Sequence, residues 1–239
     1  GQRRQAKGMG VFDIDQDKLA AARDRLLAEI AANAKETANW TGRSQFSDAV
    51  MAAMAKVPRH EFVRREDIVA AYVNRPQSIG HGQTISQPYI VALMSDLLDL
   101  EPTDRVLEIG TGCGYQAAVL AQLCRRVCTI ERYRTLLAQA EGRFEDLKLH
   151  NITTRLGDGG KGWPELAPFA RIIVTAAASE LPQTLADQLD DRGIMIVPVG
   201  PSGDQTLIRV TRQDDGFKEE RLLDVRFVPL VDGLPAGRA

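Results

Sequence analysis

The chain has 239 residues, of which 44% are hydrophobic and 26% are charged, a composition typical of a globular protein and not of a fibrous or disordered chain. Its 30 basic and 32 acidic residues leave a formal net charge of -2, so no overall field attracts it to nucleic acid or to an anionic membrane. No apolar stretch approaches the ~20 residues that span a bilayer, and no signal-peptide pattern follows the charged start. We therefore expect a soluble, cytoplasmic protein.

The cysteines and histidines favour neither disulfides nor a metal site. The three cysteines, Cys113, Cys124 and Cys128, are an odd number in a chain of this length, which suits a reducing compartment. The three histidines are scattered, and no second Cys or His pair stands at zinc-binding spacing. We predict that the protein binds no metal.

The N-terminal part predicts helices. Residues 1–14 are polar and without period, so we expect a flexible tail. Apolar residues recur at helical spacing from Asp15 to about Ala34, which predicts an amphipathic helix. Ser47 can cap a second helix, and Pro58 ends it.

Residues 75–88 predict a functional loop. This segment, RPQSIGHGQTISQP, has few bulky apolar residues but many glycines, hydroxyls and amides. We expect neither a helix nor a continuous strand there, and loops of this kind often carry function.

From Arg105 onward, short apolar strands alternate with helical segments, which predicts a parallel sheet. The expected strands are 105–109, 126–130, 152–156, 172–175 and 194–199, and the expected helices lie around 115–124, 133–147 and 182–190. Residues 206–211 and 225–230 are predicted to form a closing pair of strands around the turn-like sequence at 214–216.

The sharpest local pattern is VLEIGTGCGY, residues 106–115, in which an apolar strand runs into three glycines before a helix. Glycine lets the chain turn tightly and lets a ligand lie on the main chain, while the helix start offers free N–H groups. Tyr115 stands where the dinucleotide fingerprint requires its third glycine, so the spacing does not favour NAD.

Acidic residues follow the next two predicted strands. Glu131 lies 21 residues after Gly110, where a carboxylate can accept both ribose hydroxyls, and Asp158 stands between Gly157 and Gly159, where it can face an adenine. Each feature alone is also typical of an ordinary turn. Together they predict a nucleoside pocket at the carboxyl edge of the sheet.

This arrangement, over residues 105–199, resembles class I S-adenosylmethionine-dependent methyltransferases. The sequence IGHGQTISQP at 79–88 is similar to the hallmark of the protein-L-isoaspartate O-methyltransferases. Further similar stretches are VPRHEFV at 57–63, EIGTGCGYQAAVLA at 108–121, IVTAAA at 173–178 and VRFVPLVDG at 225–233, so the resemblance spans about Ser47 to Gly233.

The resemblance implies a Rossmann-like α/β fold with a mostly parallel sheet, antiparallel C-terminal strands and helices on both faces. We expect one structural domain, in which residues 15–104 supply helices and a cover loop and residues 105–239 supply the methyltransferase core. We also expect a monomer.

The implied cofactor is S-adenosyl-L-methionine, with S-adenosyl-L-homocysteine as its product. The loop chemistry and the resemblance together indicate a set of cofactor-binding residues: Gln83, Thr84, Ile85, Glu108, Gly110, Thr111, Gly112, Gly114, Glu131, Arg132, Gly157, Asp158, Gly159 and Thr175. The implied catalytic residue is Ser86, through its hydroxyl. The implied substrate-binding residues, besides Ser86, are Ile79, Gly80, His81, Gly82 and Val228.

The implied substrate is the free α-carboxylate of an L-isoaspartyl residue in a damaged protein or peptide, and its methyl ester initiates repair. A carboxylate of pKa near ~3.5 is ionised at neutral pH, so the reaction needs no general base. Two alternatives stay open: a methyltransferase for nucleic acid or a small molecule, and a nonenzymatic module that binds the cofactor. The absence of a base-methylating Asn/Asp-Pro-Pro-aromatic loop and of a net basic charge disfavours nucleic acid.

Three features depart from the family pattern. Cys113 stands where bacterial relatives often have serine, Ala170-Arg171 replaces an expected Asp-Ala pair, and the region before Gln45 is longer than expected. The partners of Arg171 and the role of the N-terminal helix do not follow from the sequence.

Overall fold

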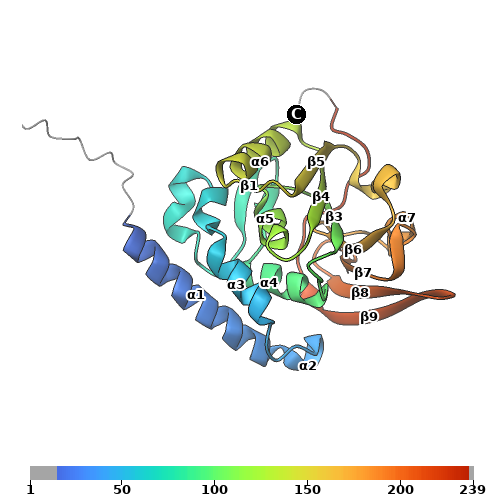
Figure 1. Cartoon of the computed structure of the whole chain (residues 1–239), viewed down its shortest axis with the longest axis horizontal. Coiled ribbons are helices and arrows are strands. Elements are labelled where there is room, and N and C mark those ends of the chain that lie inside the picture. Colours follow the sequence, from blue (N-terminus) through green and yellow to red (C-terminus); the bar gives the residue numbers. More distant parts are fainter. Residues whose placement is uncertain (1–14, 237–239) are drawn as a thin grey trace, which may run out of the picture.

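The computed structural model describes residues 15–236, so the expected tail at 1–14 lies outside the described residues. A seven-stranded sheet in the order β5-β4-β3-β6-β7-β8-β9 forms its centre (Figure 1). Its strands are β3 (Arg105–Ile109), β4 (Arg126–Glu131), β5 (Ile152–Leu156), β6 (Phe169–Val174), β7 (Leu189–Val199), β8 (Gln205–Gln213) and β9 (Gly216–Val225). Strands β3 to β7 pair in parallel, and β8 and β9 are antiparallel.

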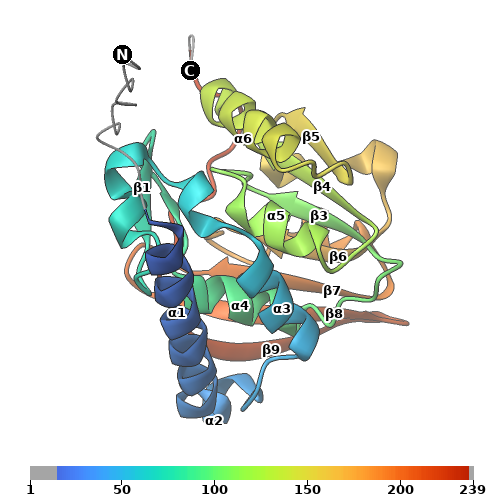
Figure 2. The same cartoon turned by 60° about the vertical axis from the view of Figure 1, so that its left-hand side comes forward.

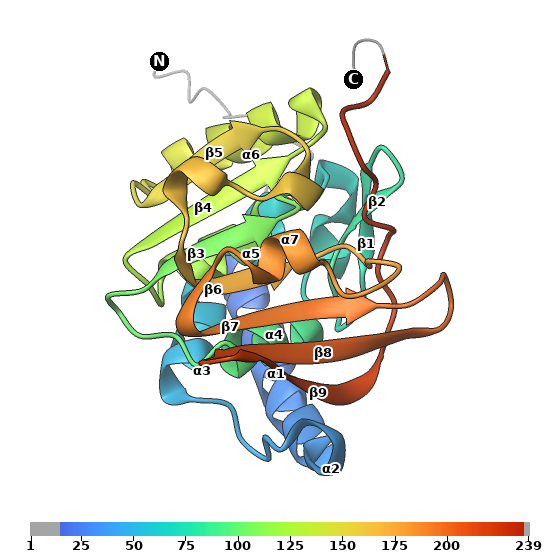
Figure 3. The same ribbon diagram turned by 90° about the vertical axis from the view of Figure 1, so that its right-hand side faces the viewer.

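Helices cover both faces of the sheet, but unequally (Figures 2 and 3). One face carries α1 (Gln16–Glu36), α3 (Asp48–Lys56), α4 (Pro88–Leu97), α5 (Tyr115–Ala121) and α6 (Arg134–Asp146). The other carries α7 (Gln183–Ala186) and the short 3-10 helices η3 (Gly159–Lys161) and η4 (Pro164–Leu166). The remaining short helices are α2 (Ala38–Thr41), η1 (Arg59–Phe62) and η2 (Arg65–Ala70).

The strands are apolar because both of their faces are buried. In β3, Val106 packs into the core cluster beneath α1 and α3 to α6, whereas Leu107 and Ile109 point into the cluster beneath α7. The N-terminal helices share the first of these clusters with the sheet. The predicted fold class, a mostly parallel Rossmann-like sheet with antiparallel C-terminal strands, is confirmed.

The predicted helix starts agree with the structure. Asp15 caps α1 by accepting the N–H of Asp17 at 2.9 Å, and Ser47 caps α3 by accepting the N–H of Val50 at 3.2 Å. Both side chains satisfy a donor that the first helical turn leaves free.

Two predictions about the C-terminal third are wrong. The closing strand expected at 225–230 is instead β9, Gly216–Val225, which starts immediately after the two-residue turn at 214–215 and ends where the expected strand was to begin. A tight hairpin turn forces pairing from its first flanking residues. The helix expected at 182–190 is only Gln183–Ala186, because β7 already begins at Leu189.

The segment 75–88 also differs from the expected loop. It contains a two-stranded antiparallel hairpin of β1 (Gln77–Gly80) and β2 (Gln83–Ile85). The turn between the strands places Gly80, His81 and Gly82 at positive φ, a conformation that glycine adopts without strain. The glycines that suggested an irregular loop therefore form a hairpin turn.

Arg171, near the start of β6, binds backbone carbonyl groups at the end of α4. Its guanidinium donates to the carbonyl oxygens of Leu98 and Asp99, which follow α4, and lies 3.9 Å from the carboxylate of Asp104. This arginine therefore joins the sheet to the end of α4.

Asn74 links α1 to the start of α4. Its Nδ2 donates to the Asn33 side chain on α1 at 2.8 Å, and its Oδ1 accepts the N–H of Tyr89 at 3.0 Å. Gln87, at the N-cap position of α4, makes no side-chain capping bond. Asn74 therefore acts as a distant cap for the helix that follows the hairpin.

We predict that Asn74→Ala lowers the free energy of unfolding by about 1 to 2 kcal/mol, because it leaves a first-turn donor of α4 uncapped. Asn33→Ala is the matched control: it removes the bond between Asn74 and α1, together with an exposed bond from Asn33 to Glu36, and leaves the cap in place. Its free energy of unfolding should therefore fall by less. Urea unfolding measures both variants. An equal loss in the two would show that Asn74 does not cap α4.

Candidate active site

The glycine loop after β3 turns sharply at three positions. Gly110, Gly112 and Gly114 have φ of 97°, 55° and 95°. A Cβ atom on Gly110 would lie 2.6 Å from the Thr175 hydroxyl, and one on Gly114 would lie 2.7 Å from the Phe144 ring of α6. The loop therefore needs glycine both for its backbone and for the close approach of its neighbours.

Glu131 stands at the end of β4 and fixes this loop. Its Oε1 accepts the N–H of Gly112 at 2.9 Å, and its Oε2 accepts the N–H of Tyr133 at 2.9 Å. A carboxylate oxygen can accept more than one hydrogen bond, so both oxygens keep capacity for ribose hydroxyls.

The β1–β2 hairpin contacts the glycine loop and the end of β4. The His81 ring at its tip stacks on the Tyr133 ring, with centroids 4.7 Å apart and planes at 22°. A Cβ atom on Gly112 would lie 3.4 Å from the Ile79 side chain. The hairpin and the ends of β3 and β4 are therefore held together.

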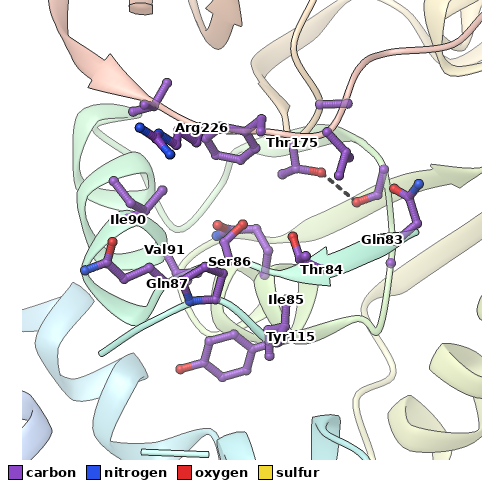
Figure 4. Close-up of a pocket in the computed structure, with 18 of the residues that line it drawn as sticks. Gln83, Thr84, Ile85, Ser86, Gln87, Ile90, Val91, Tyr115, Thr175 and Arg226 are labelled. Carbon is purple, nitrogen blue, oxygen red and sulfur yellow. Dashed lines mark hydrogen bonds between the residues drawn. The ribbon is translucent and has the colours of Figure 1, made fainter. Parts of the chain in front are cut away.

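A cavity of about 480 Å³ lies between these segments. Figure 4 shows Thr84 and Ser86 on one side of it and Thr175 and Arg226 on the other. The Thr175 hydroxyl donates to the carbonyl of Gly110 at 2.8 Å, which holds the end of β6 against the glycine loop. The C-terminal segment is fixed by Gln205, whose side chain bonds both the N–H and the carbonyl of Phe227.

Half of the predicted site residues line this cavity, and they come from both the hairpin and the strand ends. They are Gln83, Thr84, Ile85, Ser86, Gly110, Thr111, Gly112, Glu131, Thr175 and Val228. The structure therefore brings together the predicted catalytic serine and the predicted ribose-binding acid.

The other predicted residues lie outside the cavity wall. Ile79 and Gly80 end the hairpin's first strand, and His81 and Gly82 form its turn. Glu108 is buried beneath the glycine loop, and Gly114 is buried within it. Arg132 donates to the carbonyl of Gly233 at 3.2 Å. In the turn of Gly157, Asp158 and Gly159, the Asp158 side chain accepts the N–H of Gly160 at 3.0 Å and caps η3.

Several cavity residues were not predicted. They are Pro76, Gln87, Ile90, Val91, Cys113, Tyr115, Gln116, Ala176, Gly203, Asp204, Gln205, Asp224, Val225, Arg226 and Phe227. The VRFVPLVDG motif was the one signal for the last of these, and it led only to Val228. Arg226 is the single basic residue on this wall, as far as the described residues go.

Glu108 is fully buried beneath the loop. Burial and, to a smaller extent, the charge of Glu131 raise its pKa to about 8, against the opposing effect of the Thr129 hydrogen bond. Its Oε1 accepts the Thr129 hydroxyl at 2.6 Å, which lies 2.6 Å from the Thr111 hydroxyl on the cavity wall. Its Oε2 has no hydrogen-bond partner within residues 15–236.

The cavity suits a nucleoside that carries a positive charge. Backbone at Gly110 and Gly112 lines the cavity and leaves room for a flat ligand, and the carboxylate of Glu131 offers acceptors and a negative charge. Among the described residues, no cluster of three metal-ligating side chains occurs. No helix between residues 15 and 236 is long and apolar enough to cross a membrane.

Fold and cavity together define a Rossmann-like methyltransferase. The family model of the protein-L-isoaspartate(D-aspartate) O-methyltransferases matches residues 38–235. The chain belongs to this family.

Relatives in sequence carry the name of the same family. The chain is 57% identical over 188 residues to a protein-L-isoaspartate O-methyltransferase of Parvibaculum lavamentivorans, covering 77% of this chain and 85% of that one. A relative of the same name from Dictyoglomus thermophilum is 50% identical over 184 residues, which is 77% of this chain and 84% of that one.

Two solved structures share the fold. A protein-L-isoaspartate O-methyltransferase superposes with a TM-score of 0.74 at 28% identity, over 87% of this chain, which spans 65% of that protein. A Plasmodium falciparum protein described as a putative member of the same family, in complex with S-adenosyl-L-homocysteine, superposes with a TM-score of 0.72 at 25% identity, over 89% of this chain and 97% of that one.

We predict that Gly110→Ala weakens S-adenosyl-L-homocysteine binding about tenfold or more, because the new methyl group meets Thr175 and the positive φ is strained. Gly142→Ala is the control: this helical glycine of α6 has no atom within 4 Å of a new Cβ. Its affinity should be unchanged. Calorimetric titration measures the affinity of each variant for S-adenosyl-L-homocysteine. Equal affinities would contradict the role of the glycine loop in binding the cofactor.

The raised pKa of Glu108 predicts a pH effect on stability. The folded protein holds a proton up to about pH 8, whereas the unfolded chain releases it near pH ~4.3. The contribution of Glu108 to the free energy of unfolding is therefore largest below the pKa of the unfolded chain, and it declines as the pH rises toward 8.

Glu108→Gln removes this titration and keeps the shape of the side chain. We expect the stability of the variant relative to the unmodified protein to increase between pH 5 and about pH 8, by urea unfolding at several pH values. Other titrating groups cancel in the difference. A difference that does not vary with pH would show that Glu108 ionises normally.

Proposed function

We propose that the protein transfers a methyl group from S-adenosyl-L-methionine to the free α-carboxylate of L-isoaspartyl residues in damaged proteins and peptides, which initiates their repair. The observation that carries the proposal is that one cavity joins the glycine loop and Glu131 to the hairpin that bears Ser86. Family membership and the named relatives support the same activity.

The strand-end residues would hold the cofactor. Glu131 accepts the ribose hydroxyls, the backbone of Gly110 and Gly112 lies along the ligand, and Thr84 and Ile85 border it from the hairpin side. When bound, the cofactor supplies an electrophilic methyl group on a sulfonium. Asp158 lies at the same edge of the sheet, in the turn after β5, and would face the adenine ring.

Ser86 would orient the acceptor. The substrate carboxylate is ionised at neutral pH, so the hydroxyl need only donate a hydrogen bond to it and aim the second oxygen. Catalysis then depends on placing the reacting atoms about 3 to 3.5 Å apart and on excluding water. Both demands favour a cavity that is closed by a hairpin.

The main chain of the substrate would pair with the hairpin and the C-terminal segment. Ile79 and Gly80 of β1 are half-buried, the turn residues His81 and Gly82 are exposed, and Val228 lines the cavity. The Val228 carbonyl accepts the N–H of Ala177 at 2.7 Å, which fixes this segment at the end of β6. We propose that residues 79–82 and the segment around Val228 bind the main chain of the substrate, a mode of binding that does not depend on the peptide sequence.

The proposal also covers the cellular location of the enzyme, the exclusion of nucleic acid as a substrate, and the oligomeric state. Three buried free thiols support a reducing, cytoplasmic location. Among the described residues, the cavity wall carries three acidic side chains, Glu131, Asp204 and Asp224, and one basic side chain, Arg226, which disfavours nucleic acid as the substrate. We propose that the protein acts as a monomer.

The test uses labelled S-adenosyl-L-methionine and two peptides that differ only in an isoaspartyl or an aspartyl residue. Base-labile methyl ester should form on the isoaspartyl peptide alone. Ser86→Ala should lower kcat/KM roughly 100-fold without changing affinity for S-adenosyl-L-homocysteine, and Ser44→Ala, an exposed serine outside the cavity, should change neither.

Two results would contradict the proposal at different levels. An unchanged rate for Ser86→Ala would remove the role of that hydroxyl and leave the activity intact. Cofactor binding without ester on either peptide would exclude the activity and favour a nonenzymatic module.

A further inference from the structure

Arg59 is a fully buried arginine beneath the hairpin. It belongs to the VPRHEFV motif and starts η1, and its exposed fraction is 0%. No carboxylate within residues 15–236 forms an ion pair with it. A cation that is fully buried without an acid partner is rare in proteins.

Its guanidinium contacts three segments of the chain, at Ala71, Ser86 and Tyr115. Nε donates to the carbonyl of Ala71 at 2.8 Å, and Nη2 donates to the carbonyl of Ser86 at 2.9 Å. The Tyr115 ring, which lines the cavity, lies 4.8 Å from the guanidinium carbon. Nη1 has no hydrogen-bond partner among the described residues.

This arrangement is costly for stability. Desolvation by burial lowers the pKa of Arg59, and an unpaired donor adds to the penalty. Apolar residues of similar volume often replace buried charges without loss of stability. Core packing alone therefore does not explain an arginine at this position.

The bond to Ser86 has a geometric consequence. The carbonyl of Ser86 belongs to the peptide group that joins Ser86 to Gln87, and a peptide group is planar. Holding this plane restricts the ψ angle of Ser86, and with it the direction in which its side chain leaves the chain. On the other side, Tyr89 is held by Asn74, so the junction between β2 and α4 is fixed at both ends.

We propose that Arg59 is a positioning residue for methyl transfer: its hydrogen bond to the carbonyl of Ser86 aims the Ser86 hydroxyl at the substrate carboxylate. The inference rests on the proposed function, because it assigns Arg59 an effect on the isoaspartyl substrate and not on the cofactor.

The experiment compares Arg59→Lys and Arg59→Met with Arg171→Met. Arg171 also donates to several backbone carbonyls but lies away from the cavity wall, so its loss reports the general effect of removing such a clamp. For each protein, affinity for S-adenosyl-L-homocysteine is measured by calorimetry, and kcat and KM are measured with the isoaspartyl peptide.

We expect kcat/KM to decrease roughly 100-fold for Arg59→Met and about tenfold for Arg59→Lys, since small misplacement of a reacting group has effects of this size. The affinity for S-adenosyl-L-homocysteine should stay within about threefold, because the strand ends remain intact. Arg171→Met should lower the unfolding temperature with kcat/KM unchanged. If Arg59→Met does not fold, Arg59→Lys carries the test alone.

The decisive readout is a double-mutant cycle with Ser86→Ala. If Arg59 acts through the Ser86 hydroxyl, Arg59→Lys in the Ser86→Ala background should change kcat/KM by no more than about twofold, whereas independent effects multiply. A full tenfold loss in that background, or an unchanged kcat/KM for Arg59→Lys alone, would overturn the inference. A wild-type protein that forms no ester would instead overturn the proposed function.

Discussion

The carboxylate of Glu131 joins the segments on which the site depends. Through one oxygen it holds Gly112 of the glycine loop, and through the other it holds Tyr133, whose ring supports the hairpin tip at His81. A side chain that also faces the cavity thus fixes both the cofactor edge and the cover above it. Hydrogen bonds to a carboxylate are stronger than neutral ones, so this junction is rigid before a ligand binds.

Two buried ionisable groups flank the cavity from opposite sides. Glu108 lies behind the glycine loop and Arg59 lies beneath the hairpin, and each has one polar atom without a partner in the part of the chain that the structure describes. Natural proteins violate folding rules of this kind mainly at functional sites. Of the four side chains between residues 15 and 236 that carry such an atom, the two with no exposed surface, Glu108 and Arg59, lie next to the two halves of the proposed reaction, the cofactor and the acceptor.

The central strands were predictable from the sequence, because burial of both faces gives continuous apolar runs. Glu131 at the end of β4 was predictable because the strand ends of a parallel sheet meet at one edge. Helix α4 was not predicted, because it is buried nearly all round and its sequence is an almost continuous apolar run without a polar face. Strand β9 is a charged edge strand and lacks a strong strand pattern.

The site was predicted where motifs are local and missed where the fold assembles it. Gly110, Glu131 and Ser86 stand in recognisable patterns, and the cavity brings them together. Gln205 and Arg226 come from β8 and the segment after β9, which approach the hairpin only through the sheet topology. Arg59 resembles a solvated charge in the sequence, and only its burial reveals the contact with Ser86.

A crystal structure with S-adenosyl-L-homocysteine and an isoaspartyl peptide tests the account most directly. The account predicts ribose hydroxyls within hydrogen-bond distance of Glu131, and the peptide carboxylate between the Ser86 hydroxyl and the cofactor sulfur. A nucleoside bound away from Glu131, or a carboxylate that does not contact Ser86, would contradict it.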